Sequence, residues 1–255
     1  MDADKLRTLF DLTDRTVIVT GATRGIGFSL AEGYLAAGAN VVVTGRSQDR
    51  CDEAEAKLNA AGRVAAVAAH MGDLDQVKHL VEHTVSTFGG IDVVVNNAAT
   101  SLLQQFGGIT LEAWEKALSV NVTGPLFLVQ EALPHLEASR HAAVLNLISP
   151  AAFMFAGHMP LYAAGKSAMM ALTRSMAAAF ASKGIRVNAL APGPVDTQMM
   201  RNNPPEFIEA TANETLLRRL AEPDEMVGPA LLLTSDAGSY ITGQVLLADA
   251  GMVPH

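Results

Sequence analysis

The sequence predicts an α/β fold in which a doubly wound parallel sheet is covered by helices on both faces, giving three layers. Short apolar runs alternate with longer helical patterns along most of the chain, as they do in successive βαβ units. The runs are apolar throughout, which is typical of strands buried on both faces. No internal repeat and no Pro/Ser-rich linker divides the 255 residues, so we expect a single domain over residues 1–255.

Seven short, largely apolar runs are the predicted strands, at residues 16–20, 41–44, 64–68, 92–96, 143–148, 186–190 and 245–248. Apolar side chains recur at helical spacing between them, at residues 25–37, 48–60, 74–88, 111–119, 122–137 and 159–182. Right-handed crossovers through these helices make the strands parallel. Residues 197–219 break the alternation, with Pro204 and Pro205 before a short polar helical pattern. This segment is a candidate substrate lid, and the alternative is an ordinary surface excursion.

Composition and charge exclude several classes of protein. Apolar residues make up 49% of the chain and charged residues 17%, which rules out a disordered chain. The longest stretch without an ionised side chain, between Arg140 and Lys166, is interrupted by Pro150 and Pro160, so it is no membrane-spanning helix. The chain opens without a signal-peptide pattern, and we expect a cytoplasmic protein.

The net charge and the cysteine count exclude further classes of partner and site. The net charge of −8 and a pI near 5.3 argue against a nucleic acid or an anionic membrane as partner. Cys51 is the single cysteine, which excludes an internal disulfide and a cysteine-based zinc site. No His/Asp/Glu cluster suggests a metal. The expected partner is a small molecule.

A glycine-rich turn, TGATRGIG at residues 20–27, joins the first predicted strand to the first predicted helix. Gly21 permits the tight turn, Gly25 lets the backbone approach a pyrophosphate, and Gly27 lets the helix pack closely on the sheet. The N–H groups of the helix start then bind the anion. The spacing is Gly-x-x-x-Gly-x-Gly, which differs from the standard fingerprint. Its place in the chain favours dinucleotide binding over a purely structural turn.

The end of the second predicted strand indicates which dinucleotide binds. An NAD site usually has an acid there, which accepts a hydrogen bond from the ribose 2′-hydroxyl. Here Gly45 is followed by Arg46, and Arg24 lies in the glycine turn near the same ribose. Two guanidinium groups suit a 2′-phosphate. NADP(H) is therefore favoured. NAD(H) is the alternative, with Arg46 then an ordinary solvated loop charge.

Tyr162 and Lys166 lie four residues apart in a helical pattern, so their side chains share one face of the helix. A phenol has a pKa of about 10 and exchanges protons poorly at neutral pH. A cation one turn away lowers that pKa and makes Tyr162 a usable general acid or base. For this pair taken alone, the alternative to a catalytic role is that both side chains lie on a solvated helix face.

Further motifs accompany the pair: NNAA at residues 96–99, Asn121 at a predicted helix start, Ser149 at a strand end, YAAGK at 162–166 and PGPVDT at 192–197. With the glycine turn, Asp73 and ITGQVLLADAG near the end, their order resembles the short-chain dehydrogenase/reductase family over about residues 16–253. The 3-oxoacyl-acyl-carrier-protein reductases are the members that it is most similar to. Ala99, Pro150 and Ala250 depart from the usual residues, but no catalytic group is lost.

The resemblance implies a Rossmann-type fold and a catalytic set of Asn121, Ser149, Tyr162 and Lys166. Tyr162 would exchange a proton with the substrate oxygen, to which Ser149 would hydrogen-bond. Lys166 would lower the tyrosine pKa and bind the nicotinamide ribose, and Asn121 would hold a water linking Lys166 to solvent. Asp73 would contact the adenine, and Thr197 the carboxamide or the phosphates. The implied cofactor-binding set is Gly21, Thr23, Arg24, Gly25, Ile26, Gly27, Arg46, Asp73, Leu74, Asn97, Ala98, Tyr162, Lys166, Pro192, Gly193, Val195 and Thr197.

The predicted activity is NADP(H)-dependent interconversion of a ketone or aldehyde with an alcohol. The apolar residues Phe153, Met154, Phe155 and Met159 follow Ser149 and favour a substrate with an apolar portion, such as a 3-oxoacyl thioester or a steroid-like ketone. The alternatives are an NAD-dependent alcohol dehydrogenase, an epimerase or dehydratase that recycles its cofactor, and a non-catalytic cofactor-binding regulator.

The predicted helix at 159–182 is also expected to contact a second subunit. Lys166 and Arg174 are its only charges between Met159 and Ser182, and a helix that is apolar on most sides is normally buried. One face serves the site and another the core. A third face therefore predicts a homodimer or homotetramer.

Overall fold

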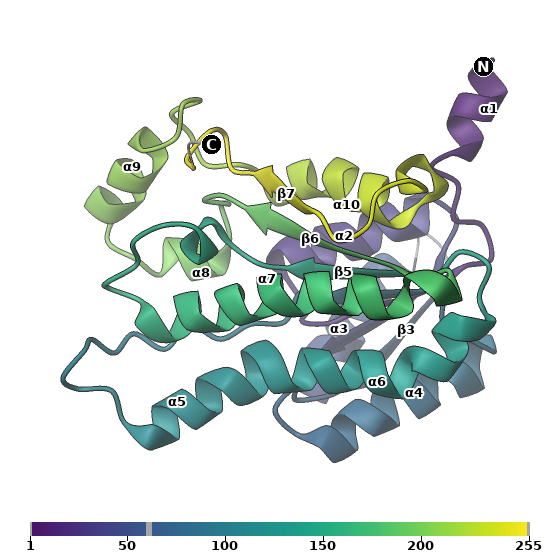
Figure 1. Cartoon of the computed structure of the whole chain (residues 1–255), viewed down its shortest axis with the longest axis horizontal. Helices are drawn as coiled ribbons and strands as arrows, with labels where there is room; N and C mark the ends of the chain where they lie inside the picture. The colour runs from purple at the N-terminus through teal and green to yellow at the C-terminus, as the bar shows by residue number, and fades with distance from the viewer. Residues whose placement is uncertain (1, 60–62, 254–255) are drawn as a thin grey trace.

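The strands form one parallel sheet in the computed structural model, which describes residues 2–59 and 63–253 (Figure 1). The strand order among these residues is β3-β2-β1-β4-β5-β6-β7, and every neighbouring pair is parallel. The order reverses between β1 and β4, so the sheet winds outward in both directions from that point, as predicted. The strands are β1 (Thr16–Val19), β2 (Asn40–Gly45), β3 (Arg63–Ala68), β4 (Val93–Asn96), β5 (Ala143–Leu147), β6 (Arg186–Pro192) and β7 (Val245–Ala248).

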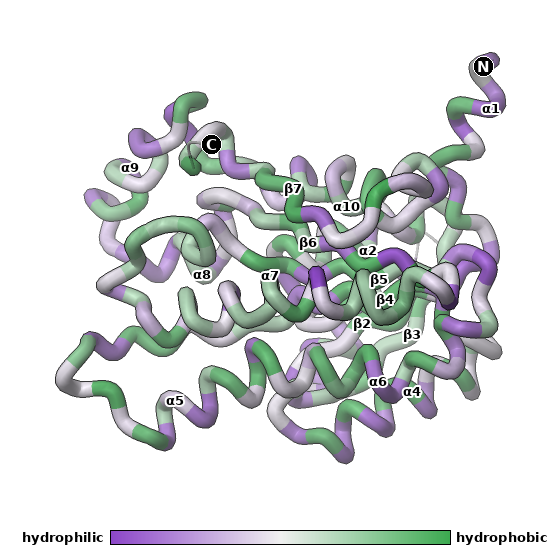
Figure 2. The backbone as a smooth tube through the Cα atoms, viewed as in Figure 1, coloured by the Kyte–Doolittle hydropathy of each residue, from purple (hydrophilic) through white to green (hydrophobic). Residues whose placement is uncertain are grey.

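Helices cover both faces of the sheet and make the three predicted layers. One face carries α2 (Gly25–Ala36), α3 (Gln48–Leu58) and α10 (Val227–Thr234). The other carries α4 (Leu74–Phe88), α6 (Gly124–Ala138) and α7 (Pro160–Phe180), with α5 (Leu111–Leu118) leading into α6. Successive strand residues face opposite sides, so Val17 and Val19 enter the first core while Ile18 enters the second. Figure 2 shows hydrophobic residues concentrated along the strands.

Most predicted helices are found, with three differences. The predicted helix at 48–60 ends at Leu58, and its last residue, Ala60, lies outside the described residues. The expectation that Asn121 begins a helix is wrong, because α5 continues into α6 through the π-helical turn η1 (Ser119–Thr123). The sequence also gave no indication of α10 or of the short α1 (Ala3–Thr8), which projects from the body in Figure 1.

The segment at 197–219 contains two short helices, α8 (Gln198–Arg201) and α9 (Pro205–Asn213). Both lie at the same end of the molecule as the loop that leads into α5 (Figure 1). Short helical turns complete the chain, namely η2 (Pro150–Ala152), η3 (Ala181–Lys183), η4 (Pro223–Met226) and η5 (Asp236–Gly238). None of the helices in the described part of the chain has the length and hydropathy needed to span a membrane.

Candidate active site

Tyr162, Lys166 and Ser149 meet where β5 ends. Ser149 follows the strand and caps η2, its Oγ accepting from the Ala151 N–H at 3.2 Å. Tyr162 and Lys166 lie one turn apart on α7, as predicted, and the Ser149 side chain is close enough to the Tyr162 hydroxyl to lower its pKa. Lys166 Nζ donates to the Leu147 carbonyl at 2.6 Å and lies 5.5 Å from the centroid of the Tyr162 ring. The three polar groups therefore converge at one edge of the sheet.

Burial dominates the electrostatics of this group. Burial raises the pKa of Tyr162 above its ordinary value, and the hydrogen bond from Ser149 partly opposes the rise. Lys166 is only 4% exposed, and burial lowers the pKa of its ammonium to about 8. The expectation that Lys166 lowers the Tyr162 pKa stays a prediction: the ammonium donates to the Leu147 carbonyl and lies over the Tyr162 ring, 5.5 Å from its centroid.

Asn121 is buried beside the catalytic helix. A methyl group built on Gly165 of α7 would lie 3.1 Å from Asn121 Cβ. The Asn121 amide clamps the loop after β4, since its Oδ1 accepts from the Thr100 N–H at 2.8 Å and its Nδ2 donates to the Thr100 carbonyl at 2.9 Å. Each end of the side chain therefore has one partner in this loop and can form one further hydrogen bond. The expectation that Asn121 holds a water linking Lys166 to solvent stays a prediction.

The glycine turn packs tightly against the residues that follow β4. Gly21 has a φ of +65°, and a methyl group built on it would lie 2.9 Å from Ala98 Cα. A methyl group on Gly27 would lie 2.4 Å from Asn97 Nδ2, an amide that donates to the Thr20 carbonyl at 2.7 Å. Neither position has room for a side chain. The turn and the Asn97-Ala98 backbone thus form one wall of the candidate site.

The start of α2 fits the pyrophosphate of a dinucleotide. Arg24 is the N-cap residue, and no side chain caps the first N–H groups, which are then free to bind an anion. Thr197, the N-cap of α8, faces the same turn, because a methyl group on Gly25 would lie 3.3 Å from its Cγ2. The segment leading to Thr197 begins where β6 ends, at Pro192 and Gly193.

The remaining predicted cofactor residues line up along this edge with less specific contacts. Ile26, in the first turn of α2, packs against the core, and Val195 forms a β-bridge to Ala221. Thr23 lies next to the end of β2, since a methyl group on Gly45 would come within 2.6 Å of its Cγ2. The predicted cofactor residues are thus brought together from the ends of β1, β2, β4 and β6.

Arg46, which directly follows β2, and Arg24, in the glycine turn, are both exposed. Neither forms an ion pair with a residue of the described ranges. Asp73 instead caps α4, accepting from the Asp75 and Gln76 N–H groups at 3.1 and 3.2 Å and from Gln76 Nε2 at 2.7 Å. Its predicted contact with adenine stays a prediction, as does that of its exposed neighbour Leu74.

Sequence reasoning missed two groups that build the site. The Thr20 hydroxyl accepts from the N–H groups of Asn97 and Ala98, each at 3.0 Å, and so joins the end of β1 to the end of β4. A polar residue closing an apolar strand was the available signal. The Leu147 carbonyl, the acceptor for Lys166, had no signal, because every residue has a backbone carbonyl.

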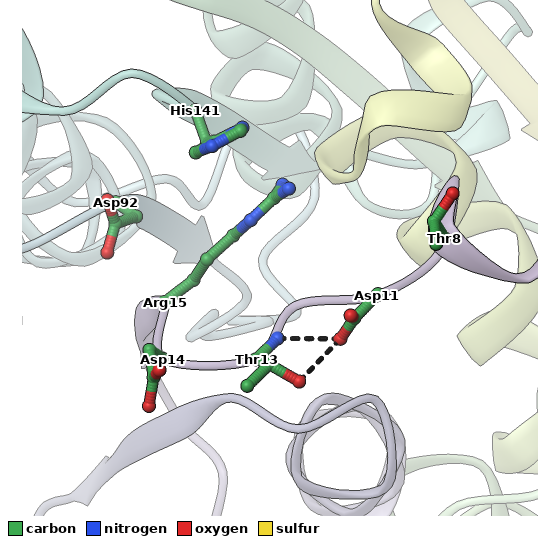
Figure 3. A pocket seen from close by; sticks show the side chains of 7 residues that line it. All are labelled: Thr8, Asp11, Thr13, Asp14, Arg15, Asp92 and His141. Atoms are coloured by element: carbon green, nitrogen blue, oxygen red, sulfur yellow. Dashed lines mark hydrogen bonds between the residues drawn. The ribbon is translucent and has the colours of Figure 1, made fainter. Parts of the chain in front are cut away.

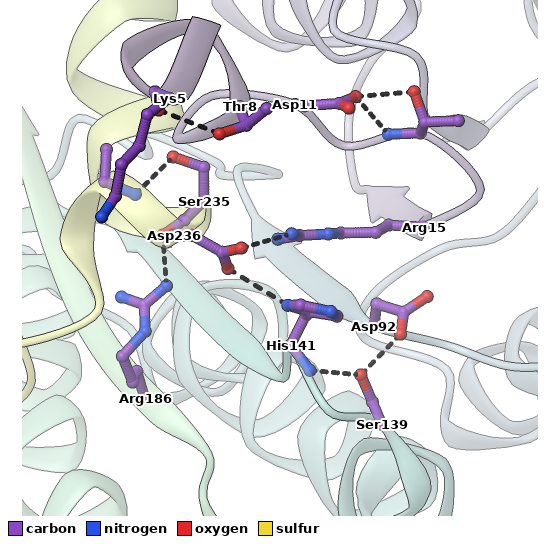
Figure 4. Close-up of polar contacts among 12 residues, drawn as sticks. Lys5, Thr8, Asp11, Arg15, Asp92, Ser139, His141, Arg186, Ser235 and Asp236 are labelled. Carbon is purple, nitrogen blue, oxygen red and sulfur yellow. Dashed lines mark hydrogen bonds and ion pairs between the residues drawn. The ribbon is translucent and has the colours of Figure 1, made fainter. Parts of the chain in front are cut away.

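A cavity of about 300 Å³ lies apart from these residues, at the amino ends of the strands (Figure 3). Several of its polar groups are hydrogen-bonded to neighbours: Asp236 accepts from Arg15 Nη2 at 2.8 Å and from His141 Nδ1 at 3.1 Å, and Asp92 accepts from Ser139 Oγ at 2.5 Å (Figure 4). We interpret this network as structural. Its lining residues are Thr8, Asp11, Thr13, Asp14, Arg15, Asp92 and His141. In residues 2–59 and 63–253, no three His, Cys, Asp or Glu side chains are grouped to hold a metal ion.

Comparison with known proteins identifies the family. The family model described as enoyl-(acyl carrier protein) reductase matches residues 21–253. The short-chain dehydrogenase/reductase SDRA of Arabidopsis thaliana is 37% identical over 249 residues, which cover 94% of this chain and 95% of that protein. The chain therefore belongs to the short-chain dehydrogenase/reductase family, whose members bind NAD(P), and it is an enzyme of that family.

Two relatives from Pseudomonas aeruginosa support the more particular resemblance. The rhamnolipids biosynthesis 3-oxoacyl-(acyl-carrier-protein) reductase is 32% identical over 249 residues, covering 95% of this chain and 97% of that protein. The solved RhlG/NADP active-site complex superposes with a TM-score of 0.91 at 32% identity, covering 96% of this chain and 98% of that chain. The predicted similarity to 3-oxoacyl-acyl-carrier-protein reductases is confirmed.

Proposed function

We propose that this enzyme interconverts a ketone or aldehyde with an alcohol, using NADP(H) and Tyr162 as the general acid and base. The convergence of Tyr162, Ser149 and Lys166 at the end of β5 is the observation that carries the proposal. The glycine turn supports it, because the uncapped start of α2 suits a pyrophosphate. Both parts lie at the carboxyl edge of the sheet, where ligands bind in open α/β folds.

In the reducing direction, NADPH when bound supplies a hydride to the carbonyl carbon. The Tyr162 hydroxyl donates its proton to the substrate oxygen as negative charge develops there. Ser149 donates a hydrogen bond to the same oxygen and orients it. Lys166 has three N–H donors and gives one to Leu147, so two remain for the phenolate that Tyr162 leaves and for a ribose hydroxyl. In the oxidising direction the same groups act in reverse.

The preference for NADP(H) is supported by two exposed arginines, Arg46 directly after β2 and Arg24 in the glycine turn. Replacing Arg46 with Asp tests it. We expect the ratio of kcat/KM for NADPH to that for NADH to fall at least about tenfold, because a 2′-phosphate loses a charge-assisted hydrogen bond and meets a carboxylate. Arg50→Asp changes the same charge on the exposed surface of α3 and is the matched control. An equal fall of this ratio in both variants would contradict the assignment of Arg46 to the 2′-phosphate of NADP(H).

The preference for an apolar portion in the substrate is supported by apolar side chains that stay exposed around the site. Phe153, Met154 and Phe155 are 38%, 41% and 108% exposed on the loop after β5, and Met199 and Phe207 are exposed on α8 and α9. Such surfaces mark binding sites for apolar groups. We propose that the segment at 197–219, which bears α8 and α9, is a lid that covers the substrate.

A substrate panel tests the proposed reaction. Ketones, aldehydes, 3-oxoacyl thioesters, steroid ketones, their alcohols and aldoses are each incubated with NADPH, NADH or the oxidised forms, while NAD(P)H absorbance is followed. Turnover of carbonyls with apolar chains supports the proposal. Turnover confined to aldoses contradicts the substrate class, and substrate conversion without absorbance change would indicate an epimerase or dehydratase instead.

We also propose that the enzyme forms a homodimer or homotetramer and works in the cytoplasm. The exposed face of α7 consists of Arg174 and small residues, namely Ala171, Ser175, Ala178 and Ala179, which would let a partner helix approach closely. Sedimentation at micromolar concentration tests the assembly, and a monomer would contradict it. Cell fractionation tests the location.

A further inference from the structure

Three polar contacts join α7 to β5 along a single line. Tyr162 lies beside Ser149, whose side chain acts on the phenol, Lys166 Nζ donates to the Leu147 carbonyl, and Asn146 Nδ2 donates to Thr173 Oγ1 at 2.9 Å. At 100° per residue, Tyr162, Lys166 and Thr173 lie within about 40° of one another around the helix. The face of α7 that bears both proposed catalytic side chains therefore also bears Thr173.

The order of these contacts shows that they share one register. From Tyr162 through Lys166 to Thr173 along α7, the partners on the other element run backwards from Ser149 through Leu147 to Asn146. The helix thus runs antiparallel to β5, and a shift at the Thr173 contact would be transmitted along the helix axis to the other two. Asn146 and Thr173 are both 0% exposed, so water cannot replace their bond.

The remaining buried side chains on α7 are apolar and set the register weakly. They include Leu161, Met169, Met176 and Ala177. Apolar contact is not directional, so it tolerates small rotations and slides of the helix. A hydrogen bond between two fully buried side chains has strict distance and angle requirements, and an unpaired partner would be left without solvent. The Asn146–Thr173 bond is therefore, with the Lys166–Leu147 bond, one of two directional contacts between buried groups of α7 and β5.

The bond also belongs to a network that reaches the cofactor wall. Thr173 Oγ1 donates to the Met169 carbonyl at 2.7 Å, and Asn146 Oδ1 accepts from Asn96 Nδ2 at 2.9 Å. Asn96 ends β4 and directly precedes Asn97, whose amide lies against the glycine turn. One chain of hydrogen bonds thus connects α7, β5 and β4.

We propose that Asn146 and Thr173 are positioning residues, which hold the register of α7 on β5 so that Tyr162 meets Ser149 and Lys166 meets Leu147. They touch neither substrate nor cofactor. The proposal rests on the proposed function for its catalytic consequence, while the geometry that it predicts at Tyr162 is measured without turnover.

Thr173→Val tests the proposal, because it removes the hydroxyl and keeps the shape of the side chain. With Ser149 displaced from the Tyr162 hydroxyl, the phenol loses the hydrogen bond that lowers its pKa. We therefore expect the Tyr162 phenolate to form at higher pH in the cofactor-free protein. We also expect kcat to fall about ten- to hundredfold, with a smaller change in the KM for NADPH, to which Lys166 supplies a single hydrogen bond.

The titration is readable because the chain has three tyrosines. Tyr34 is fully buried and has a raised pKa, and Tyr240 is fully exposed. In a Tyr34→Phe, Tyr240→Phe background, Tyr162 is the one remaining tyrosine, so the ultraviolet phenolate signal reports it alone. This measurement requires no substrate, so it separates failure of the proposal from failure of the proposed function.

Thr84→Val is the matched control. Thr84 is a fully buried helical threonine whose Oγ1 donates to the Leu80 carbonyl at 2.8 Å, as that of Thr173 does to Met169, but it lies on α4. Thr84→Val should leave the Tyr162 titration and kcat unchanged. Thr173→Ser, which keeps the hydroxyl, should give the wild-type titration and kcat. Thr173→Ala serves as a second variant if the valine variant does not fold. The proposal is overturned if Thr173 variants that lack the hydroxyl keep the wild-type titration, or if Thr84→Val shifts it equally.

Discussion

Replacing Lys166 with Met should stabilise the cofactor-free protein at neutral pH, although it removes a proposed catalytic group. Lys166 is 4% exposed, and its ammonium has a single hydrogen-bond partner in the described structure, the Leu147 carbonyl. Burial lowers the pKa of the ammonium from 10.5 to about 8, so holding the charge in the folded state costs free energy. Methionine fills a similar volume without a charge.

The magnitude follows from the pKa. At about 1.4 kcal/mol per pH unit, the lowered pKa corresponds to about 3 kcal/mol of lost stability at pH 7. The substitution leaves the Leu147 carbonyl without its donor, which costs about 1 kcal/mol. We therefore expect Lys166→Met to raise the free energy of unfolding by about 2 kcal/mol at pH 7.

The advantage should disappear in alkaline solution. The folded-state pKa of Lys166 is below the unfolded value of 10.5, so between about pH 8 and 10.5 the unfolded chain binds the proton that the folded chain has released. Wild-type stability therefore gains from rising pH in this window. Above about pH 10.5, Lys166 is uncharged in both the folded and the unfolded chain. The stability difference that remains is the cost of the unpaired Leu147 carbonyl in the variant.

Urea denaturation at pH 7 and pH 10, at one protein concentration and without cofactor, measures the difference. Lys57→Met, at an exposed position on α3, controls for the change in charge and should show no such dependence on pH. A Lys166→Met protein that is less stable than wild type by the same amount at both pH values would refute the reasoning.

Three further predictions concern the cofactor wall, the core and the lid. Gly27→Ala should weaken NADPH binding by at least about tenfold in fluorescence titrations, because the alanine methyl group would lie 2.4 Å from the Asn97 amide. An unchanged NADPH affinity would contradict the close packing of the glycine turn against Asn97. Tyr34→Phe should lower the free energy of unfolding by about 1 kcal/mol with unchanged kinetics, because the buried Tyr34 hydroxyl is hydrogen-bonded to Thr234. A urea midpoint equal to that of wild type would contradict this. The Arg219 guanidinium holds the pKa of Glu225 at about 2, so the ion pair between these two side chains stays charged from pH 4 to 7. Proteolysis of the segment at 197–219 should therefore proceed at one rate over this range, and Arg219→Gln should accelerate it. Equal rates in both proteins would contradict a role for this ion pair.

The sheet could be predicted because each of its strands is a short, largely apolar run. The helices that escaped prediction lack the corresponding pattern. The sequence of α10, VGPALLLT, is apolar on every side, and α1 has only 6 residues, which is too short for a periodicity to emerge. The π-helical turn that holds Asn121 was missed because a shifted backbone hydrogen bond has no residue signature.

The candidate site could be predicted where side-chain type and spacing determine it. Tyr162 and Lys166 share a face because four residues make about one helical turn, and the glycines of the turn reflect close packing that only glycine allows. The direction of the lysine could not be predicted. Its ammonium turns to the Leu147 carbonyl, and the competition between that acceptor and the Tyr162 hydroxyl depends on the packing of α7 against β5.

Activity of a Tyr162→Phe variant tests the central claim most directly. NADPH oxidation is followed with a carbonyl substrate that wild type reduces, and NADPH binding is measured in parallel by fluorescence. Loss of the proton donor should lower kcat by about a thousandfold, while NADPH affinity stays within a few-fold of wild type because the ring still fills its place. A variant that binds NADPH normally and retains near wild-type turnover would contradict the role of Tyr162.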